Sequence, residues 1–373
     1  MNKTIKWIGG LIIVLVVLVL ILSQKTGQIN KVEPIKIGAI LPLTGPQGSF
    51  GGWMQEGINL ALEDINTNKI GIIYEDSKSD PKEGVTAFNK LLEVDNTKIM
   101  ISAMSSVSVP LVPLAEQNKV LLFVQDVRYP NFSKDKTMVL RHFIQSDREA
   151  PLMADYSIDK LRASKVGILY VNDEAGQGAK EAFKNEFEKR GGQVVDMESY
   201  LGKDTDMKTQ ILKIKESGAN SIYLSGNGPS WAQSLKQIKE LNFKGNILTD
   251  TAMFIPTFRN IAGSSTEGVY FTYPYADTSS QSYQTFISKY NAKYGKEPAI
   301  ESYYAWDLIH VINAALENNN WKTDNLKQVI VNMKEFNGAF GKTIINSDGD
   351  FLTPIGIGVI KNGQIDGIKV VNP

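Results

Sequence analysis

The sequence predicts an α/β fold in which parallel sheets are divided between two lobes. From residue 35 onward, short apolar runs rich in β-branched residues alternate with segments of helical periodicity. This alternation is typical of parallel sheets with helices on both faces. The alternating region of roughly 320 residues exceeds the usual size of one such sheet. The chain has 373 residues and is 42% hydrophobic, which is enough for two cores.

The periodicity assigns each element to a residue range. Strands are expected at 35–41, 70–75, 98–102, 120–124, 165–171, 192–199, 219–225, 245–249, 267–272 and 356–361. Most are separated by helices, which are expected at 54–67, 81–94, 107–118, 147–162, 175–190, 206–217 and 229–241.

A loop rich in glycine and proline, Pro42–Gly52, follows the first strand and precedes the first helix. In open α/β sheets, ligands bind beyond the carboxyl ends of the strands, where such loops lie. The loop does not end in Lys-Ser or Lys-Thr, and it lacks the G-x-G-x-x-G spacing, so it is neither a P-loop nor a dinucleotide site.

Several stretches of the chain carry a family resemblance. They are IGAILPLTGPQGSFGG (37–52), YEDSKSDPKEGVTAFNKLL (74–92), SAMSSVSVPLVPLAEQNKVLLF (102–123) and VGILYVNDEAGQGAKEAFKNEFEKRGGQVV (166–195). Together they resemble the type I solute-binding proteins of the branched-chain amino-acid-binding group, the extracytoplasmic receptors of ABC importers. The similarity extends over almost all of region 33–365. It is specific for the fold and the broad role, and weak for the ligand.

The resemblance implies two Rossmann-like lobes joined by three chain crossings. The crossings are expected near Ile144–Asp147, Tyr273–Ala276 and Asp350–Pro354. Lobe one is then expected to be 33–145 plus 275–352, and lobe two 146–274 plus 353–373. Three hinge segments permit closure over a ligand while limiting twist. ABC permease and ATPase subunits are the partners that the resemblance implies.

The N-terminus, residues 1–27, is expected to be a membrane anchor or a signal sequence. Lys3 and Lys6 precede the apolar run Ile8–Leu22, and this order leaves the N-terminus in the cytoplasm. Membrane attachment through residues 5–22 competes with a cleaved signal peptide.

The segment after the apolar run favours an uncleaved anchor, because residues 23–27 offer no small-x-small cleavage site. Residues 28–32 are then a tether. On either interpretation, residues 28–373 lie outside the cytoplasm.

Composition excludes several classes of site. The chain contains no cysteine, so disulfides, thiolate metal sites, cysteine nucleophiles and a lipid-modified cysteine are excluded. Basic and acidic residues number 40 each, so no net field favours nucleic acid. We expect a monomer.

An enzyme is not expected. The two histidines are His142, in a strand-like stretch, and His310, on the apolar helix 301–316, and no serine motif or zinc motif accompanies them. Serines without a nearby histidine have no general base. The stretch Asn346–Asp350 resembles a calcium loop but lacks the glutamate at the twelfth position, so a turn is expected. We therefore expect no cofactor and no metal.

The first candidate site is the serine loop after the strand at 98–102, with Ser105, Ser106 and Ser108. Hydroxyl and N–H groups at a helix N-terminus suit a carboxylate, and simple helix capping is the alternative. The resemblance implies that this loop holds the ligand carboxylate, with Ser106 first and Ser105 second.

Three more candidate residues lie in the expected first lobe. Phe50 occupies the place where relatives often have an aromatic ring near the ligand, whereas Trp53 is expected to pack. Asp126 and Arg128 follow the strand at 120–124. Arg128 can bind a carboxylate or phosphate through two hydrogen bonds, and Asp126 an ammonium group. The alternative is a solvated pair at the rim that contributes little.

In the expected second lobe, the candidates depart from the family pattern. Relatives have aromatic residues where this chain has Ala175, in the loop that starts at Asn172, and Asn227. Asp250 and Thr251 follow the strand at 245–249, where relatives place an acid for the α-ammonium group; a helix N-cap is the alternative for Asp250.

These departures favour a polar or charged solute, such as another amino acid, an amide or an organic acid. The expected function is that of a solute-binding receptor of an ABC importer. A ligand-sensing co-receptor for a membrane signalling partner is the alternative.

Overall fold

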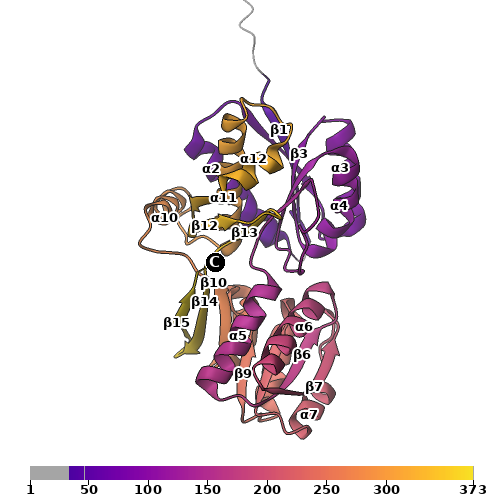
Figure 1. The fold of residues 1–373 in the computed structure, drawn as a ribbon, viewed down its shortest axis with the longest axis vertical. Helices are drawn as coiled ribbons and strands as arrows, with labels where there is room; N and C mark the ends of the chain where they lie inside the picture. Colours follow the sequence, from indigo (N-terminus) through magenta and orange to yellow (C-terminus); the bar gives the residue numbers. More distant parts are fainter. Residues whose placement is uncertain (1–32, 46, 373) are drawn as a thin grey trace, which may run out of the picture.

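The computed structural model describes residues 33–45 and 47–372, which form two α/β lobes, one above the other in Figure 1. The expected two-lobe α/β fold is confirmed. The expected membrane segment, 5–22, and the tether, 28–32, lie outside the described residues. Within the described part of the chain, no helix combines the length and the apolar character that crossing a membrane requires.

The sheet of lobe one has eight strands in the order β11-β12-β13-β5-β4-β3-β1-β2. Parallel pairing joins β2, β1, β3, β4, β5 and β13, and β12 and β11 continue the sheet antiparallel. The strands are β1 (Ile35–Leu41), β2 (Ile70–Asp76), β3 (Ile99–Ala103), β4 (Leu121–Gln125), β5 (Val139–His142), β11 (Glu335–Gly338), β12 (Gly341–Ile345) and β13 (Asp350–Leu352).

The sheet of lobe two has seven strands in the order β15-β14-β10-β9-β8-β6-β7. The pairs of β14 with β10 and with β15 are antiparallel, and the other pairs are parallel. The strands are β6 (Lys165–Val171), β7 (Gln193–Tyr200), β8 (Ser221–Ser225), β9 (Asn246–Thr249), β10 (Tyr270–Pro274), β14 (Ile355–Lys361) and β15 (Gln364–Val371).

The expected parallel pairing is confirmed for most strands of each sheet, but both sheets are mixed, because each also contains antiparallel pairs. Antiparallel neighbours need only a tight turn, whereas parallel neighbours need a long crossover. β14 and β15 are joined by Asn362 and Gly363, with φ of 53° and 72°. Asn-Gly with two positive φ angles is typical of the two-residue turn of a β-hairpin, so the sequence did contain a signal for β15.

Helices cover both faces of each sheet. In Figure 1, α3 and α4 lie on one side of the lobe-one strands, and α2 and α11 on the other. The lobe-one helices are α2 (Gly48–Ile65), α3 (Pro81–Glu93), α4 (Ser105–Asn118), α10 (Gln281–Tyr294), α11 (Ile300–Asn318) and α12 (Leu326–Met333). Those of lobe two are α5 (Ser146–Leu161), α6 (Glu174–Lys189), α7 (Lys208–Glu216), α8 (Gly228–Glu240) and α9 (Pro256–Ala262), with 3₁₀ turns at Thr251–Phe254 and Gly263–Thr266.

Helix α2 begins six residues before the predicted start, because it includes the second half of the glycine-rich loop. A Cβ atom on Gly51 would lie 2.2 Å from the carbonyl oxygen of Pro42, so only glycine allows the helix to pass so close to the end of β1. Phe50 is consequently a helical residue, not a loop residue.

The chain passes between the sheets at three places, within residues 143–145, 275–280 and 353–354. The limits of the lobes as moving units, 33–145 plus 275–352 and 146–274 plus 353–373, stay a prediction.

Candidate functional site

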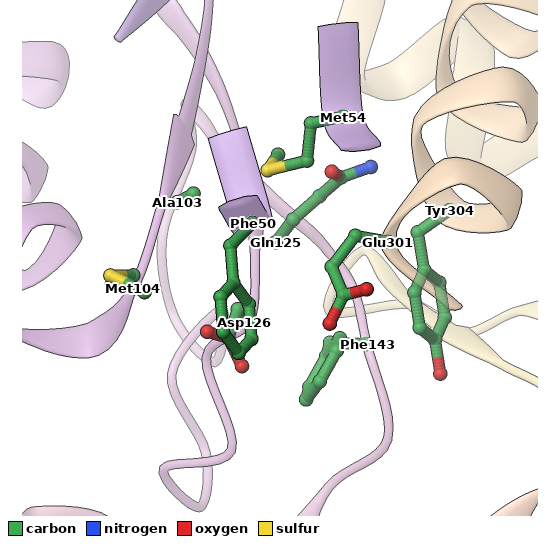
Figure 2. Close-up of a pocket in the computed structure, with 9 residues that line it drawn as sticks. All are labelled: Phe50, Met54, Ala103, Met104, Gln125, Asp126, Phe143, Glu301 and Tyr304. Carbon is green, nitrogen blue, oxygen red and sulfur yellow. The ribbon is translucent and has the colours of Figure 1, made fainter. Parts of the chain in front are cut away.

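A small pocket lies at the carboxyl ends of β3 and β4, near the crossing segment 143–145. Its volume is ≈ 10 Å³, about the room that one water molecule takes. Figure 2 shows the nine side chains that line it, which come from α2, from the ends of β3 and β4, from the crossing and from α11. They are Phe50, Met54, Ala103, Met104, Gln125, Asp126, Phe143, Glu301 and Tyr304.

Two residues at the strand ends adopt the left-handed region, which is uncommon for non-glycine residues. Met104, after β3, has a φ of 73°, and Asp126, after β4, has a φ of 53°. The Met104 N–H donates to the carbonyl oxygen of Gln125 at 3.1 Å, which ties the two loops together. Backbone conformations of this kind cluster at functional sites.

Two carboxyl groups belong to the pocket. Glu301, in the first turn of α11, is 4% exposed, and Asp126 is partly buried. Burial raises the pKa of Glu301 to about 8, and the Asp126 charge adds to this effect. Burial raises the pKa of Asp126 to about 7, although Arg128 opposes the change. Both groups therefore exchange protons near neutral pH.

Gln125 contributes a buried amide. Its side chain is 2% exposed, and neither its nitrogen nor its oxygen has a hydrogen-bond partner among residues 33–45 and 47–372. Native proteins pair nearly all buried polar groups, so an unpaired amide that lines a pocket points to a missing partner.

Arg128 connects this loop of lobe one to lobe two. Its Nε donates to Glu149 Oε1 on α5 at 2.9 Å, and its Nη2 lies 2.8 Å from Asp250 Oδ2, just after β9. Both carboxylates are fully buried, and Arg128 is 7% exposed. The solvated rim pair considered from the sequence is therefore wrong, because Arg128 is enclosed by two acids of the other lobe.

The two acids are held by further bonds within lobe two. Glu149 Oε2 accepts from the Thr272 hydroxyl at 2.8 Å and from the Thr251 N–H at 3.1 Å. Burial raises the pKa of Glu149 despite the nearby guanidinium. Burial alone would lower the pKa of Arg128, but Asp250 and Glu149 raise it well above its usual range.

Asp250 also caps the 3₁₀ turn that follows it. Its Oδ1 accepts from the Ala252 N–H at 3.0 Å, so the N-cap interpretation is confirmed. Its Oδ2 accepts from the Ser225 hydroxyl at 2.9 Å and from the Gly226 N–H at 3.2 Å, in addition to the Arg128 contact. With these partners, Asp250 has little capacity left for a ligand.

The serine loop divides into two parts. Ser108 is fully buried, and its hydroxyl bonds to that of Ser102 at 2.8 Å inside lobe one, so it does not reach the pocket. Ser105 and Ser106 are the first two residues of α4, with Ser105 half-buried and Ser106 exposed. The N-cap of α4 is Met104, which makes no side-chain cap, so the simple capping interpretation of the serines is wrong.

The pocket at the ends of β3 and β4 is not lined by the lobe-two candidates Asn172, Ala175 and Asn227. Asn172 lines a wider cleft of ≈ 930 Å³ between α4 and the start of α6. Asn227 is exposed, Ala175 is half-buried, and neither lines the pockets described here.

Phe50 joins the pocket to lobe two, because its ring lies 6.3 Å from that of Phe258 on α9. Its ring is also 5.5 Å from that of Trp53. A second opening of ≈ 160 Å³ runs between Trp53 and the Phe254–Pro256 segment of lobe two and shares Glu301 with the pocket.

Sequence reasoning missed Glu301, Gln125 and Glu149. Glu149 and Glu301 each lie on a mostly apolar buried face of a helix, Glu149 beside Ala150 and Met153 and Glu301 beside Tyr304 and Ala305. An acid at a core position of a helix is the signal that would have found both.

Neither histidine faces the pocket. His142 is fully buried, and its Nε2 lies 3.2 Å from Asp307 Oδ2. His310 Nε2 lies 3.3 Å from Asp64 Oδ2, and burial lowers the pKa of His310 to about 4. The Asn346–Asp350 stretch forms a turn in which Asn346 Oδ1 accepts from the Asp350 N–H at 2.8 Å. No group of three His, Asp or Glu side chains within the described ranges is arranged to hold a metal ion.

Comparisons with known proteins agree with this architecture. The profile of the family described as periplasmic binding protein matches residues 34–364. The Leu/Ile/Val-binding protein homolog 3 of Brucella melitensis is 25% identical over 330 residues, which cover 86% of this chain and 89% of that protein.

Solved structures of binding proteins have the same fold as this chain. A leucine-binding protein of Thermotoga maritima has a TM-score of 0.85 and 28% identity, and the match covers 91% of this chain and 99% of that one. A solute-binding protein of an ABC transporter from R. palustris, in complex with benzoate, has a TM-score of 0.80 and 17% identity, with 91% and 97% coverage. At that identity the second likeness shows the fold alone. The resemblance seen in the sequence is confirmed.

Proposed function

Since the chain belongs to the periplasmic binding protein family, we propose that it is the extracytoplasmic solute-binding receptor of an ABC importer. Its ligand is a small polar solute, such as an amino acid, an amide or an organic acid, taken up between the two lobes. The protein recognises this solute without transforming it. ABC permease and ATPase subunits are its partners, residues 5–22 attach it to the membrane, and it acts as a monomer.

The observation that carries the proposal is the unpaired polar content of the pocket beside the lobe crossing. Gln125 and Glu301 are at least nine-tenths buried, and the amide of Gln125 has no partner in the described part of the chain. Leaving such groups unpaired costs about 1–3 kcal/mol each. A solute that bonds to them while the lobes are closed removes this cost.

The three crossings supply the hinge. Arg128 lies in lobe one, and its partners Glu149 and Asp250 lie in lobe two, so parting the lobes breaks these contacts and closure restores them. With a volume of ≈ 10 Å³, the pocket is too small for a solute in this structure, so the proposal includes a parting of the lobes before the solute enters. Rotation about short hinge segments is a common route to such closure.

The start of α4 is our candidate for an anionic part of the solute. Ser105 and Ser106 are its first residues, and the first N–H groups of a helix have no acceptor within the helix. Leucine and benzoate, the ligands named for two structural relatives, both carry a carboxylate. A carboxylate at this helix end follows the usual preference for anions.

A thermal-shift screen of the purified full chain tests the proposal. The panel contains amino acids, amides, organic acids, amines and nucleosides. A solute at one hundred times its dissociation constant stabilises a protein by about 2.7 kcal/mol. One chemical class that raises the unfolding midpoint of the wild type, and raises it less in the Ser106→Ala variant, supports the receptor function. A flat response across the panel contradicts it.

A further inference from the structure

The pocket contains two acids and no basic side chain. Asp126 and Glu301 both line it, and Figure 2 shows the carboxyl group of Glu301 extending from α11 on the side where Asp126 lies. Arg128, the cation nearest to Asp126 along the chain, is enclosed by Glu149 and Asp250. Its charge is therefore largely offset by lobe two, although it still favours the ionised form of Asp126. Among residues 33–45 and 47–372, neither pocket acid forms an ion pair of its own.

The other pocket groups also suit a cation. The amide of Gln125, 2% exposed and without a partner among the described residues, lines the same pocket and offers a carbonyl oxygen as an acceptor. The rings of Phe50, Phe143 and Tyr304 complete the wall, and aromatic faces attract ammonium and guanidinium groups.

We propose that the solute carries a cationic group, an ammonium or an amidinium, and that Asp126 and Glu301 of lobe one bind it. This inference rests on the proposed function and adds the charge of the ligand to it. Asp250, which the resemblance suggested for this role, is occupied by Arg128, Ser225 and Gly226. Charge-assisted hydrogen bonds to two carboxylates are among the stronger polar contacts in proteins.

Binding of a cation is coupled to proton release. Burial raises the pKa of Asp126 to about 7 and that of Glu301 to about 8, so the empty pocket holds protons near neutral pH. The charged or titratable groups that face the pair are Arg128, which favours the ionised form of Asp126, and Tyr304, beside Glu301. A bound cation favours the ionised carboxylates, and the displaced protons leave to the buffer.

The test is isothermal titration calorimetry of the full chain with simple probes. The cations are n-butylammonium and acetamidinium, and the matched neutral and anionic probes are 1-butanol and butyrate. Each is titrated at about pH 6 and about pH 8 into the wild type, Asp126→Asn and Glu301→Gln. Glu93→Gln is the control, because Glu93 is an exposed acid at the end of α3, in the same lobe.

We expect saturable binding of the cations, at least about tenfold tighter at the higher pH, with proton release that scales with the ionisation heat of the buffer. Asp126→Asn and Glu301→Gln should each weaken binding by about tenfold or more, whereas Glu93→Gln should not change it.

Binding of butanol or butyrate in preference to the cations overturns the inference and leaves the receptor function standing. Equal cation binding by Asp126→Asn, Glu301→Gln and the wild type also overturns it. Failure of every probe contradicts the inference, and the broader thermal-shift panel then decides the proposed function separately.

Discussion

The guanidinium group of Arg128 lies 2.8 Å from the carboxylate of Asp250, and the contact joins lobe one to lobe two. Arg128 also contacts Glu149, so one cation offsets two buried acids. Removing one partner of a buried ion pair is far more costly than the net stability of the pair suggests. We call the contacts of Arg128 with Glu149 and Asp250 the latch, and we expect them to stabilise the arrangement of the two lobes seen in this structure.

The first prediction concerns this latch. Arg128→Ala leaves Glu149 and Asp250 buried without a cation, and we expect it to lower the free energy of unfolding by about 3–5 kcal/mol. Urea unfolding at neutral pH measures this change. Replacing the exposed Lys36 by Ala is the control, and it should change stability by less than about 0.5 kcal/mol.

A rescue experiment separates charge from packing. Adding Glu149→Gln and Asp250→Asn to Arg128→Met removes all three charges and should recover a substantial part of the lost stability. If the triple variant loses as much unfolding free energy as the three single variants lose in sum, the latch does not depend on charge.

The second prediction concerns the two pocket acids. In the folded protein, the pKa of Asp126 rises from 3.8 to about 7 and that of Glu301 from 4.5 to about 8. The folded state thus keeps protons that the unfolded chain has released. The contribution of these protons to the free energy of unfolding is fully present at pH values below the pKa that each acid has in the unfolded chain. It is lost as the pH rises through the pKa values of the folded protein, about 7 and about 8.

Asp126→Asn and Glu301→Gln should therefore each raise the free energy of unfolding of the solute-free protein by about 2 kcal/mol at about pH 9. At about pH 4 the gain should be small. Asparagine also tolerates the left-handed backbone of residue 126. Urea unfolding at both pH values measures the difference. Loss of stability in both variants at the high pH would show that the acids are structural.

The third prediction separates the serines of α4. Ser108→Ala leaves the buried Ser102 hydroxyl without its 2.8 Å partner, so unfolding should become easier by about 1–3 kcal/mol. Ser106→Ala, at an exposed position, should leave stability within about 0.5 kcal/mol. Thermal unfolding without solute gives both values, and a large effect at Ser106 would contradict its exposed placement.

The fourth prediction uses two neighbouring glycines of α2. A Cβ atom on Gly51 would lie 2.2 Å from the Pro42 carbonyl oxygen, whereas Gly52 has no such neighbour within 4 Å. Gly51→Ala should cost about 1–3 kcal/mol or more. Gly52→Ala should stabilise the helix by about 0.5–1 kcal/mol. Equal effects of the two substitutions would contradict the close packing of α2 against the end of β1.

The sequence predicted the fold well where periodicity is strong and local. The strands at 35–41 and 165–171 match β1 and β6 to the residue. The antiparallel strands β11 to β13 are short and depend on tertiary pairing, so their pattern is weak.

The site was harder to predict, because its residues meet only in the folded chain. Phe50 and Asp126 were among the sequence candidates, and both line the pocket. Glu301 reaches it from 175 positions further along the chain than Asp126, and no local pattern shows that approach. The sequence indicated Arg128 as a candidate site residue but not as a contact between the lobes. Its partners Glu149 and Asp250 belong to separate segments of the chain.

Calorimetric titration of the full chain with the solute that gives the largest thermal shift is the most direct test of a receptor that binds a cationic solute. We expect one saturable site per chain and recovery of the solute unchanged. Binding should be weaker in Asp126→Asn and Glu301→Gln but not in Glu93→Gln. Chemical conversion of the solute, or binding that is indifferent to both pocket acids, would contradict a receptor whose cleft recognises a cationic solute.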